Sequence, residues 1–387
     1  MSLDSDAIDR VFENAIATNA VPGAVAVTAN RAGITYAKAF GLHDVSTGEP
    51  MRTDSVQRIA SMTKLATSIA LLQLVERSKL QLDTPVGDVL PAYDQLQVLE
   101  GFDGDVPLFR QPSRRGTILQ LLTHTSGLAY PMWNAKLTRL AEVHDVPPLG
   151  SGLRRAFETP LVCDPGTEFN YGMGMDWVGL VIEAVSGLSF ETYLEENLFR
   201  PLGLGDTVVR RSPEQVARSG SVHVRLEAGK WLAIAADYYM PGVDRPEFYA
   251  GGHSLYSTPL EFLRIQSAIL NGGEHASHRL LRPETVDAMF ENQIGALEVG
   301  TIATADPPAS LDVPLAGFKW GLGIMVNTEQ RPKGRSAGSG GWAGGFNTFY
   351  WIDRSKDLTA AMYTQTLPFY DPGVIECYEA FEAALYA

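Results

Sequence analysis

The chain carries strand-like segments at its two ends and helical segments between them, and this order restricts the folds that it can adopt. Near the N-terminus, residues 24–29 and 34–40 have the composition of strands, and the four residues between them include a glycine, as in a hairpin. Toward the C-terminus, three further runs have this composition: 318–326, 346–352 and 358–365. We therefore expect one antiparallel sheet built from both ends of the chain.

Apolar residues at helical spacing indicate the elements that accompany this sheet. Residues 4–17 and 372–386 are predicted to form terminal helices that flank it. Residues 61–77 are predicted to form a core helix that is buried along a single stripe. Further helical patterns follow: 118–122, 137–143, 177–185, 190–198 and 260–270.

The order of these segments predicts an α/β fold of the α+β type with two domains. Residues 1–85 and 255–387 are expected to form a discontinuous α/β domain, and residues 86–254 a mainly helical domain inserted into it. The active site is expected in the cleft between the two domains.

The charge balance disfavours several classes of partner. With 31 Lys and Arg against 45 Asp and Glu, the formal net charge is −14, which opposes binding to nucleic acids and to anionic lipid surfaces. The N-terminus is acidic where a secretory signal is basic and then apolar, and the most apolar stretch, residues 69–75, is too short to span a bilayer. We expect a cytoplasmic protein without a membrane segment. Cys163 and Cys377 are predicted to be buried small hydrophobic residues rather than a disulfide.

The segment Ser61-Met62-Thr63-Lys64 places a hydroxyl and an amine three residues apart at the start of a predicted helix. Side chains at that spacing share one face, so the amine of Lys64 can take the proton of Ser61 during attack on a carbonyl carbon. Backbone N–H groups at the start of a helix can hold the oxyanion that develops. The pattern alone has low specificity, and a serine that caps a surface helix is the alternative interpretation.

Two later segments can complete such a site. Tyr171, in Phe169-Asn170-Tyr171-Gly172, precedes a predicted helix and can act as a second proton relay; a hydrogen-bonded core aromatic is the alternative. The glycine-rich residues 338–345 lead into the predicted strand 346–352 and allow the close backbone approach that an oxyanion hole requires; a flexible turn is the alternative. The order of helix, tyrosine and glycine-rich edge is more specific than any one of the motifs.

Five segments form a wider pattern: Ser61-Met62-Thr63-Lys64, the run LLTHTSGL at 121–128, Pro165-Gly166-Thr167 leading into Tyr171, Gly251-Gly252 before Ser257, and Gly341-Trp342-Ala343-Gly344-Gly345. With them, nearly the whole chain resembles the superfamily of serine β-lactamases and penicillin-binding proteins, and within it the class C-like carboxylesterases known as family VIII. The resemblance implies a β-lactamase-like fold. It also implies Ser61 as the acylated nucleophile and Lys64 as its proton acceptor. Tyr171 is implied as the partner in proton transfer to the leaving group and to the deacylating water, and the backbone amides of Ser61 and Gly345 as the oxyanion hole.

Two positions depart from the lactamase pattern. Met173 stands where lactamases have an asparagine two residues after the tyrosine, so an amide that could contact a substrate amide is missing. Trp342 stands where they have a lysine, whose charge pairs with a substrate carboxylate. An indole offers a flat apolar wall instead. Both departures favour neutral, apolar substrates, and small esters fit that description best.

Aromatic residues near these motifs are candidates for a substrate pocket. Tyr130, Trp133 and Tyr256, together with Trp342, can line an acyl or alcohol pocket, and core packing is the alternative for the first three. His124 is expected to be structural, as a hydrogen-bonding loop histidine. The sequence has no His-Glu-x-x-His or Cys/His metal spacing, no nucleotide-binding glycine motif after a predicted strand and no Gly-x-Ser-x-Gly elbow. No metal or other cofactor is therefore expected.

Together these features predict a serine carboxylesterase that hydrolyses small, short-acyl carboxylic esters through an acyl-enzyme on Ser61. Its expected partner is a small-molecule ester, with no nucleic acid and no membrane. Three alternatives remain open. The same Ser-Lys-Tyr site can serve a hydrolase of β-lactams or other amides, also as a side activity, or an acyltransferase that passes the acyl group to an alcohol. A non-catalytic binding protein on the same scaffold is the least favoured alternative.

Overall fold

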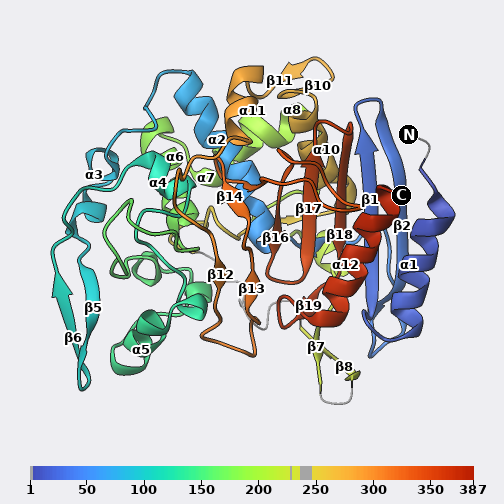
Figure 1. Cartoon of the computed structure of the whole chain (residues 1–387), viewed down its shortest axis with the longest axis horizontal. Helices are drawn as coiled ribbons and strands as arrows, with labels where there is room; N and C mark the ends of the chain where they lie inside the picture. The colour runs from blue at the N-terminus through green and yellow to red at the C-terminus, as the bar shows by residue number, and fades with distance from the viewer. Residues whose placement is uncertain (1–2, 227–228, 236–245) are drawn as a thin grey trace.

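The central sheet of this computed structural model joins the two ends of the chain. The structure describes residues 3–226, 229–235 and 246–387. Within them, eight strands form one sheet in the order β14-β15-β16-β17-β18-β1-β2-β3, and all neighbouring strands are antiparallel. Strand β1 pairs with β18 in the register Val25↔Tyr363 (Figure 1), which confirms the predicted sheet from both termini. The bounds are β1 (Gly23–Asn30), β2 (Gly33–Asp44), β3 (Glu49–Pro50), β14 (Phe318–Trp320), β15 (Met325–Asn327), β16 (Gly340–Gly344), β17 (Thr348–Asp353) and β18 (Leu358–Tyr363).

Two C-terminal segments differ from their predicted structure. The run 318–326 is a hairpin of β14 and β15 rather than one strand, because Gly323 has a φ of +75° and turns the chain between them. The glycine-rich residues 338–345 were expected to lead into a strand, but most of them form a strand themselves. This strand, β16, pairs with β17 along its whole length. The hydrogen bonds to β15 and β17 outweigh the low strand propensity of glycine there.

Helices cover the central strands β1, β17 and β18, whose residues are almost all buried. Helices α1 (Ser5–Ala17) and α12 (Pro372–Leu385) lie side by side against the sheet, and α10 (Pro259–Leu270) packs on its central strands (Figure 1). The Phe12 ring of α1 lies 5.2 Å from the ring of Phe381 on α12 and 5.0 Å from that of Phe40 on β2. The predicted terminal helices and the predicted helix at 260–270 are thereby confirmed.

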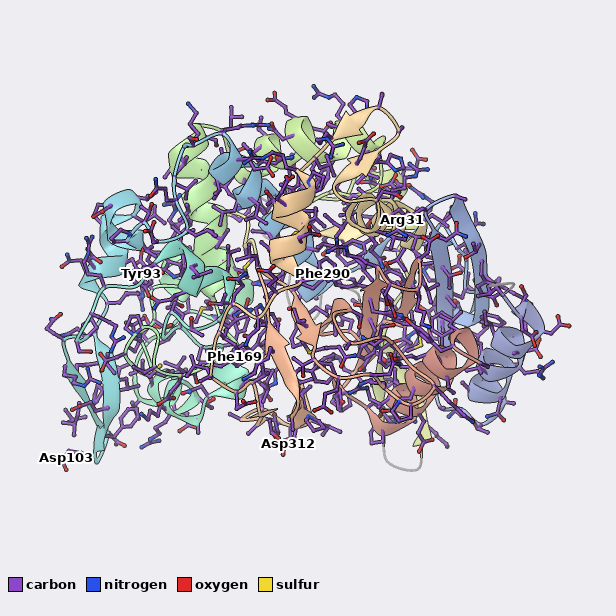
Figure 2. The ribbon with its side chains drawn as sticks, turned by 45° about the horizontal axis from the view of Figure 1, so that its top comes forward. Arg31, Tyr93, Asp103, Phe169, Phe290 and Asp312 are labelled. Atoms are coloured by element: carbon purple, nitrogen blue, oxygen red, sulfur yellow. The ribbon has the colours of Figure 1, made fainter. Side chains whose placement is uncertain are left out.

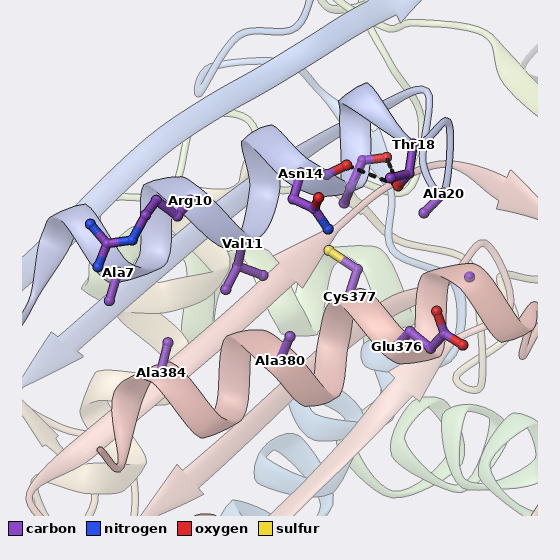
Figure 3. Close-up of a pocket in the computed structure, with 12 residues that line it drawn as sticks. Ala7, Arg10, Val11, Asn14, Thr18, Ala20, Glu376, Cys377, Ala380 and Ala384 are labelled. Atoms are coloured by element: carbon purple, nitrogen blue, oxygen red, sulfur yellow. Dashed lines mark hydrogen bonds between the residues drawn. The ribbon is translucent and has the colours of Figure 1, made fainter.

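A groove of about 600 Å³ runs between α1 and α12 (Figure 3). Small side chains such as Ala7, Ala380 and Ala384 form much of its walls, and the thiol of Cys377 lies among them. None of the residues predicted to be catalytic lines this groove. Cys163 and Cys377 are both buried and free, which confirms their predicted state.

Helix α2 (Thr63–Glu76) runs through the interior of the molecule (Figure 1). All of its residues from Thr63 to Leu74 are buried, so the prediction of burial along a single stripe is wrong. The reason is that α6 (Gly174–Ser186) and α7 (Phe190–Leu194) pack against it, while the turn η1 (Ala60–Met62) leads directly into its first residue. Polar groups on its other faces find protein partners in place of water: the Thr67 hydroxyl donates to the carbonyl oxygen of Gly251 at 2.6 Å.

The remaining elements surround this helix and the sheet. The further helices are α3 (Val86–Val89), α4 (Ile118–Leu122), α5 (Ala135–Val143), α8 (Arg200–Leu202), α9 (Pro213–Ala217) and α11 (Pro283–Met289). The further strands are β4 (Gln57–Arg58), β5 (Val98–Asp103), β6 (Val106–Arg110), β7 (Val222–Arg225), β8 (Trp231–Ile234), β9 (Tyr256–Ser257), β10 (Glu274–His275), β11 (His278–Arg279), β12 (Thr301–Ile302), β13 (Val313–Pro314) and β19 (Thr366–Leu367). No helix of the described residues is long and apolar enough to cross a membrane.

The middle segment, 86–254, contains the predicted helices but also strands that were not predicted. Hairpin β5–β6 projects at its edge, and Figure 2 shows Asp103 at the tip of this hairpin, far from Arg31 in the turn between β1 and β2. Strand β7 pairs with β8 and, in parallel, with β19, so this segment also contributes to a small sheet with the C-terminal part of the chain. The predicted domain limits stay a prediction, and the ranges 1–2, 227–228 and 236–245 within them lie outside the described residues.

Candidate active site

Ser61 lies in the turn η1, immediately before α2, where the backbone is strained. The preceding Ala60 has a φ of +43°, in the left-handed region that residues other than glycine rarely adopt. Strand β16 approaches this turn so closely that a Cβ atom on Gly344 would lie 2.3 Å from the carbonyl oxygen of Ile59. The glycine therefore allows the end of β16 to contact the turn that carries the serine.

Lys64 lies one helical turn after Ser61, and its amine is buried beside the serine hydroxyl. The distance from Nζ to Oγ is 3.0 Å, and Lys64 is 1% exposed. Burial lowers the pKa of Lys64 to about 7, although the negative charge of Asp176 opposes this shift. A large fraction of the amine is therefore neutral near pH 7, and a neutral amine can accept the proton of Ser61.

Tyr171 contacts both of these groups. Its hydroxyl is hydrogen-bonded to Ser61, and its ring centroid lies 4.8 Å from Nζ of Lys64. Burial raises the pKa of Tyr171 above its ordinary value, so the phenol keeps its proton at neutral pH. The indole Nε1 of Trp342 donates to the same hydroxyl at 2.9 Å. Because the indole N–H can only donate, the phenol's own proton is left for Ser61 or for a leaving group.

His124 supports the loop that carries Tyr171. Its Nδ1 accepts a hydrogen bond from the backbone amide of Gly172 at 3.2 Å, and its ring centroid lies 4.6 Å from that of Tyr171. Burial, assisted by the charge of Lys64, holds the pKa of His124 well below its ordinary value, so the ring is neutral. Its contacts are those of the hydrogen-bonding loop histidine that the sequence led us to expect. Phe169, labelled in Figure 2, packs against His124 with 5.9 Å between ring centroids.

Ser61 opens into a cavity of about 430 Å³. Gly345, directly after β16, lines the same cavity, and an oxyanion hole formed by its amide and that of Ser61 stays a prediction. Most of the wall is apolar, and it includes Tyr130 and Trp133 from the predicted aromatic pocket. Among the described residues that line the cavity there is no Lys or Arg, and Asp306 is the one carboxylate.

Two other members of the predicted pocket are not among the described residues that line this cavity. Tyr256 does not line this cavity, because its ring packs against the guanidinium groups of Arg58 and Arg211, with ring centroid distances of 5.4 and 4.2 Å. Trp342 does not line the cavity either. It contacts Tyr171, the tyrosine that is predicted to be catalytic, and its ring centroid lies 4.7 Å from that of Trp320. The role of these two residues in substrate binding stays a prediction.

A buried polar cluster beside Lys64 was missed by the sequence analysis. Asp176 on α6 is 0% exposed and accepts hydrogen bonds from the hydroxyl of Tyr130 at 2.6 Å and from the amide of Gly252 at 2.8 Å. Its Oδ1 also lies 3.3 Å from Nδ1 of His253. A signal was present in the sequence, since Asp176 is an acidic residue in the first turn of a mainly apolar helix. Its partners come from distant segments and have no common spacing.

The sequence matches the profile of the Beta-lactamase family over residues 8–384, nearly the whole chain. The chain belongs to the β-lactamase family. The order of its motifs and its antiparallel sheet with flanking helices are those of this family's fold. No group of three or more His, Cys, Asp or Glu that could hold a metal ion occurs in the part of the chain that the structure describes.

Within the β-lactamase family, the chain is similar to proteins that transfer or hydrolyse acyl groups. It is 32% identical to monacolin J acid methylbutanoyltransferase of Aspergillus terreus, over 98% of this chain and 95% of that protein. It is 32% identical to lovastatin esterase of Penicillium rubens, over 91% of this chain and 90% of that protein. The solved structure of unliganded simvastatin synthase from Aspergillus terreus superposes with a TM-score of 0.84 at 30% identity, covering 98% and 97% of the two chains. The protein is thus a serine acyl hydrolase or acyltransferase of the β-lactamase fold.

Proposed function

We propose that this member of the β-lactamase family is a serine carboxylesterase that hydrolyses small, short-acyl esters through an acyl-enzyme on Ser61. The observation that carries the proposal is the lack of a Lys or Arg side chain on the described wall of the cavity. Ser61, Lys64 and Tyr171 meet at the end of a mainly apolar cavity, and no Lys or Arg is found among the described residues of its wall. A neutral ester suits this wall, because a substrate carboxylate would be desolvated there without a cation to pair with.

The geometry supports a two-stage reaction. Ser61 attacks the ester carbonyl while Lys64 accepts the hydroxyl proton, and the amides of Ser61 and Gly345 stabilise the oxyanion. Tyr171 then gives its proton to the leaving alcohol and recovers one from Lys64, whose amine lies 4.8 Å from the phenol ring. A water molecule attacks the acyl-enzyme by the same route in reverse, which releases the acid and restores Ser61.

Trp342 supports an ester substrate over a β-lactam. Its indole N–H donates to the tyrosine hydroxyl from the position where the lactamase pattern has a lysine. The tyrosine thus keeps a hydrogen-bond donor beside it, but the site gains no positive charge for a substrate carboxylate.

The test compares initial rates on p-nitrophenyl butyrate and on a chromogenic cephalosporin for the wild-type protein and for Ser61→Ala. We expect ester hydrolysis that falls at least about 10³-fold in the variant, with little opening of the lactam. Rapid lactam opening that depends on Ser61 would overturn the proposed substrate class. Ester hydrolysis that survives in Ser61→Ala would overturn the assignment of Ser61 as the nucleophile.

Acyl transfer to an alcohol is the second candidate, because the similar proteins include a methylbutanoyltransferase. A cavity of about 430 Å³ has room for an acceptor alcohol beside a short acyl group. The two functions differ in what attacks the acyl-enzyme. With p-nitrophenyl butyrate and increasing concentrations of an apolar alcohol, a hydrolase yields mainly butyrate, whereas a transferase yields mainly the new ester.

A further inference from the structure

The amine of Lys64 has three polar neighbours, and their chemistry fixes where its hydrogens can point. Besides Oγ of Ser61 at 3.0 Å, Nζ lies 2.9 Å from the carbonyl oxygen of Gly252 and 3.5 Å from the hydroxyl of Tyr130. The carbonyl oxygen can only accept a hydrogen bond. The hydroxyl of Tyr130 can donate or accept, so its orientation decides what Lys64 can do.

Asp176 decides that orientation. Its carboxylate can only accept hydrogen bonds, and its Oδ2 lies 2.6 Å from the Tyr130 hydroxyl, so the single phenol proton points at Asp176. Its Oδ1 faces the amide of Gly252 and Nδ1 of His253. Three donors therefore surround a carboxylate that is 0% exposed, which keeps it ionised.

These contacts determine where the two hydrogens and the lone pair of a neutral Lys64 amine point. A neutral amine has two N–H groups and one lone pair. One N–H is taken by the carbonyl of Gly252 and the other by the oxygen of Tyr130, because the proton of Tyr130 is already committed to Asp176. The lone pair that remains faces Ser61.

We propose that Asp176 is a positioning residue for the reaction: through Tyr130 and Gly252 it orients Lys64 so that the amine lone pair points at the serine hydroxyl. The inference rests on the proposed function, in which Lys64 is the proton acceptor. Asp176 reaches neither Ser61 nor the cavity wall, so its effect passes through its neighbours. The titratable groups around Lys64 are Tyr130, Tyr171, His124, His253 and Asp176.

The first variant is Asp176→Asn, tested in the full chain with p-nitrophenyl butyrate. The amide oxygen can still accept from Gly252 and His253, but the amide N–H₂ then faces Tyr130 and turns the phenol proton toward Lys64. We expect kcat/KM at its pH plateau to fall about 10- to 100-fold with little change in KM. We also expect the acidic limb of the pH profile to move to lower pH, because the carboxylate charge favours protonated Lys64 and is removed.

The second variant, Tyr130→Phe, separates this role from a loss of structure. It removes a donor from Asp176, whose charge then favours protonated Lys64 more strongly, so the acidic limb should move to higher pH. In the Tyr130→Phe background, Asp176→Asn should reduce the plateau much less than it does alone, because the phenol proton that it would turn is absent. Equal effects in the two backgrounds would overturn the proposal. If Asp176→Asn does not fold, the pH profile of Tyr130→Phe alone tests the proposal. An acidic limb at the same pH as in the wild type overturns it.

A matched control and a covalent probe complete the test. Glu183→Gln removes a carboxylate two turns along the same helix, where Glu183 contacts Arg154 and the amide of Phe190, and its pH profile should match the wild type. Labelling by a fluorophosphonate reports on Ser61 whichever substrate is used. A wild-type protein that is not labelled at Ser61 contradicts the proposed function, whereas equal labelling rates in wild type and folded Asp176→Asn contradict the role of Asp176.

Discussion

The indole nitrogen of Trp342 donates a hydrogen bond to the hydroxyl of Tyr171 at 2.9 Å. This contact connects β16 of the sheet with the loop that precedes α6, and it gives the tyrosine a donor that carries no charge. Tyr171 is therefore neutral, buried and oriented at once. The same pair explains how a tryptophan can replace the lysine of the lactamase pattern and still provide a hydrogen-bond donor to the hydroxyl of Tyr171.

Replacing Trp342 by Phe should lower kcat for ester hydrolysis and leave KM nearly unchanged. The variant keeps an aromatic ring but loses the N–H that orients Tyr171, and one hydrogen bond of about 1 kcal/mol corresponds to roughly a fivefold change in rate. Steady-state kinetics with p-nitrophenyl butyrate measure both constants. A raised KM with an unchanged kcat would show instead that the indole contacts the substrate.

The pH dependence of the reaction should report Lys64. The pKa of its buried amine is lowered to about 7, and the amine must be neutral to accept the serine proton. The value of kcat/KM should therefore rise with pH through a midpoint near 7 and then level off. Profiles from pH 5 to 9 with p-nitrophenyl butyrate measure this, and a rate independent of pH in that range would contradict the assignment of Lys64 as the base. Lys64→Arg, which stays charged, should be inactive across the range.

The sequence predicted the elements that carry the reaction because their patterns are local. The Ser61-to-Lys64 spacing, the loop of Tyr171 and the strands at both termini each lie within a short segment, and β1 and β18 pair as expected. The prediction was wrong where burial depends on distant elements. Helix α2 packs against α6 and α7, which are distant in sequence, so no periodicity within residues 61–77 can indicate its full burial.

The polar cluster around Asp176 shows the same limit at the site. Its members, Tyr130, Asp176, Gly252 and His253, come from three separate parts of the chain and meet only in the folded protein. Composition favoured an aromatic pocket role for Tyr256 as much as for Tyr130. Only the tertiary structure separates the tyrosine that contacts Lys64 from the one that packs on Arg58.

Removing the buried carboxylate of Glu382 should destabilise the fold without changing the chemistry. Glu382 on α12 accepts hydrogen bonds from the side chain and the amide of Arg335, and both residues are buried. Glu382→Gln leaves a buried guanidinium without its counter-charge, at a cost of about 3–5 kcal/mol. Urea unfolding measures the loss, and kcat should be unchanged below the transition. The exposed pair Arg52–Asp54 is the control, since Asp54→Asn should cost less than about 1 kcal/mol.

Two adjacent glycines at the end of β16 should respond very differently to alanine. A Cβ atom on Gly344 would lie 2.3 Å from the carbonyl oxygen of Ile59, whereas a Cβ atom on Gly345 would meet no atom within 4 Å. Gly344→Ala must push β16 away from the turn that carries Ser61, and so it should lower kcat/KM about tenfold or more and reduce the melting temperature.

Gly345→Ala is the matched control for this effect. It keeps the backbone amide that we assign to the oxyanion hole and has space for its methyl group, so it should retain the wild-type melting temperature. The comparison needs only thermal unfolding curves and initial rates on p-nitrophenyl butyrate for the two variants. Equal losses of rate in both variants would mean that added bulk in the cavity, and not the position of β16 against Ile59, limits the reaction. A loss confined to Gly344→Ala would tie the activity of Ser61 to the close approach of β16.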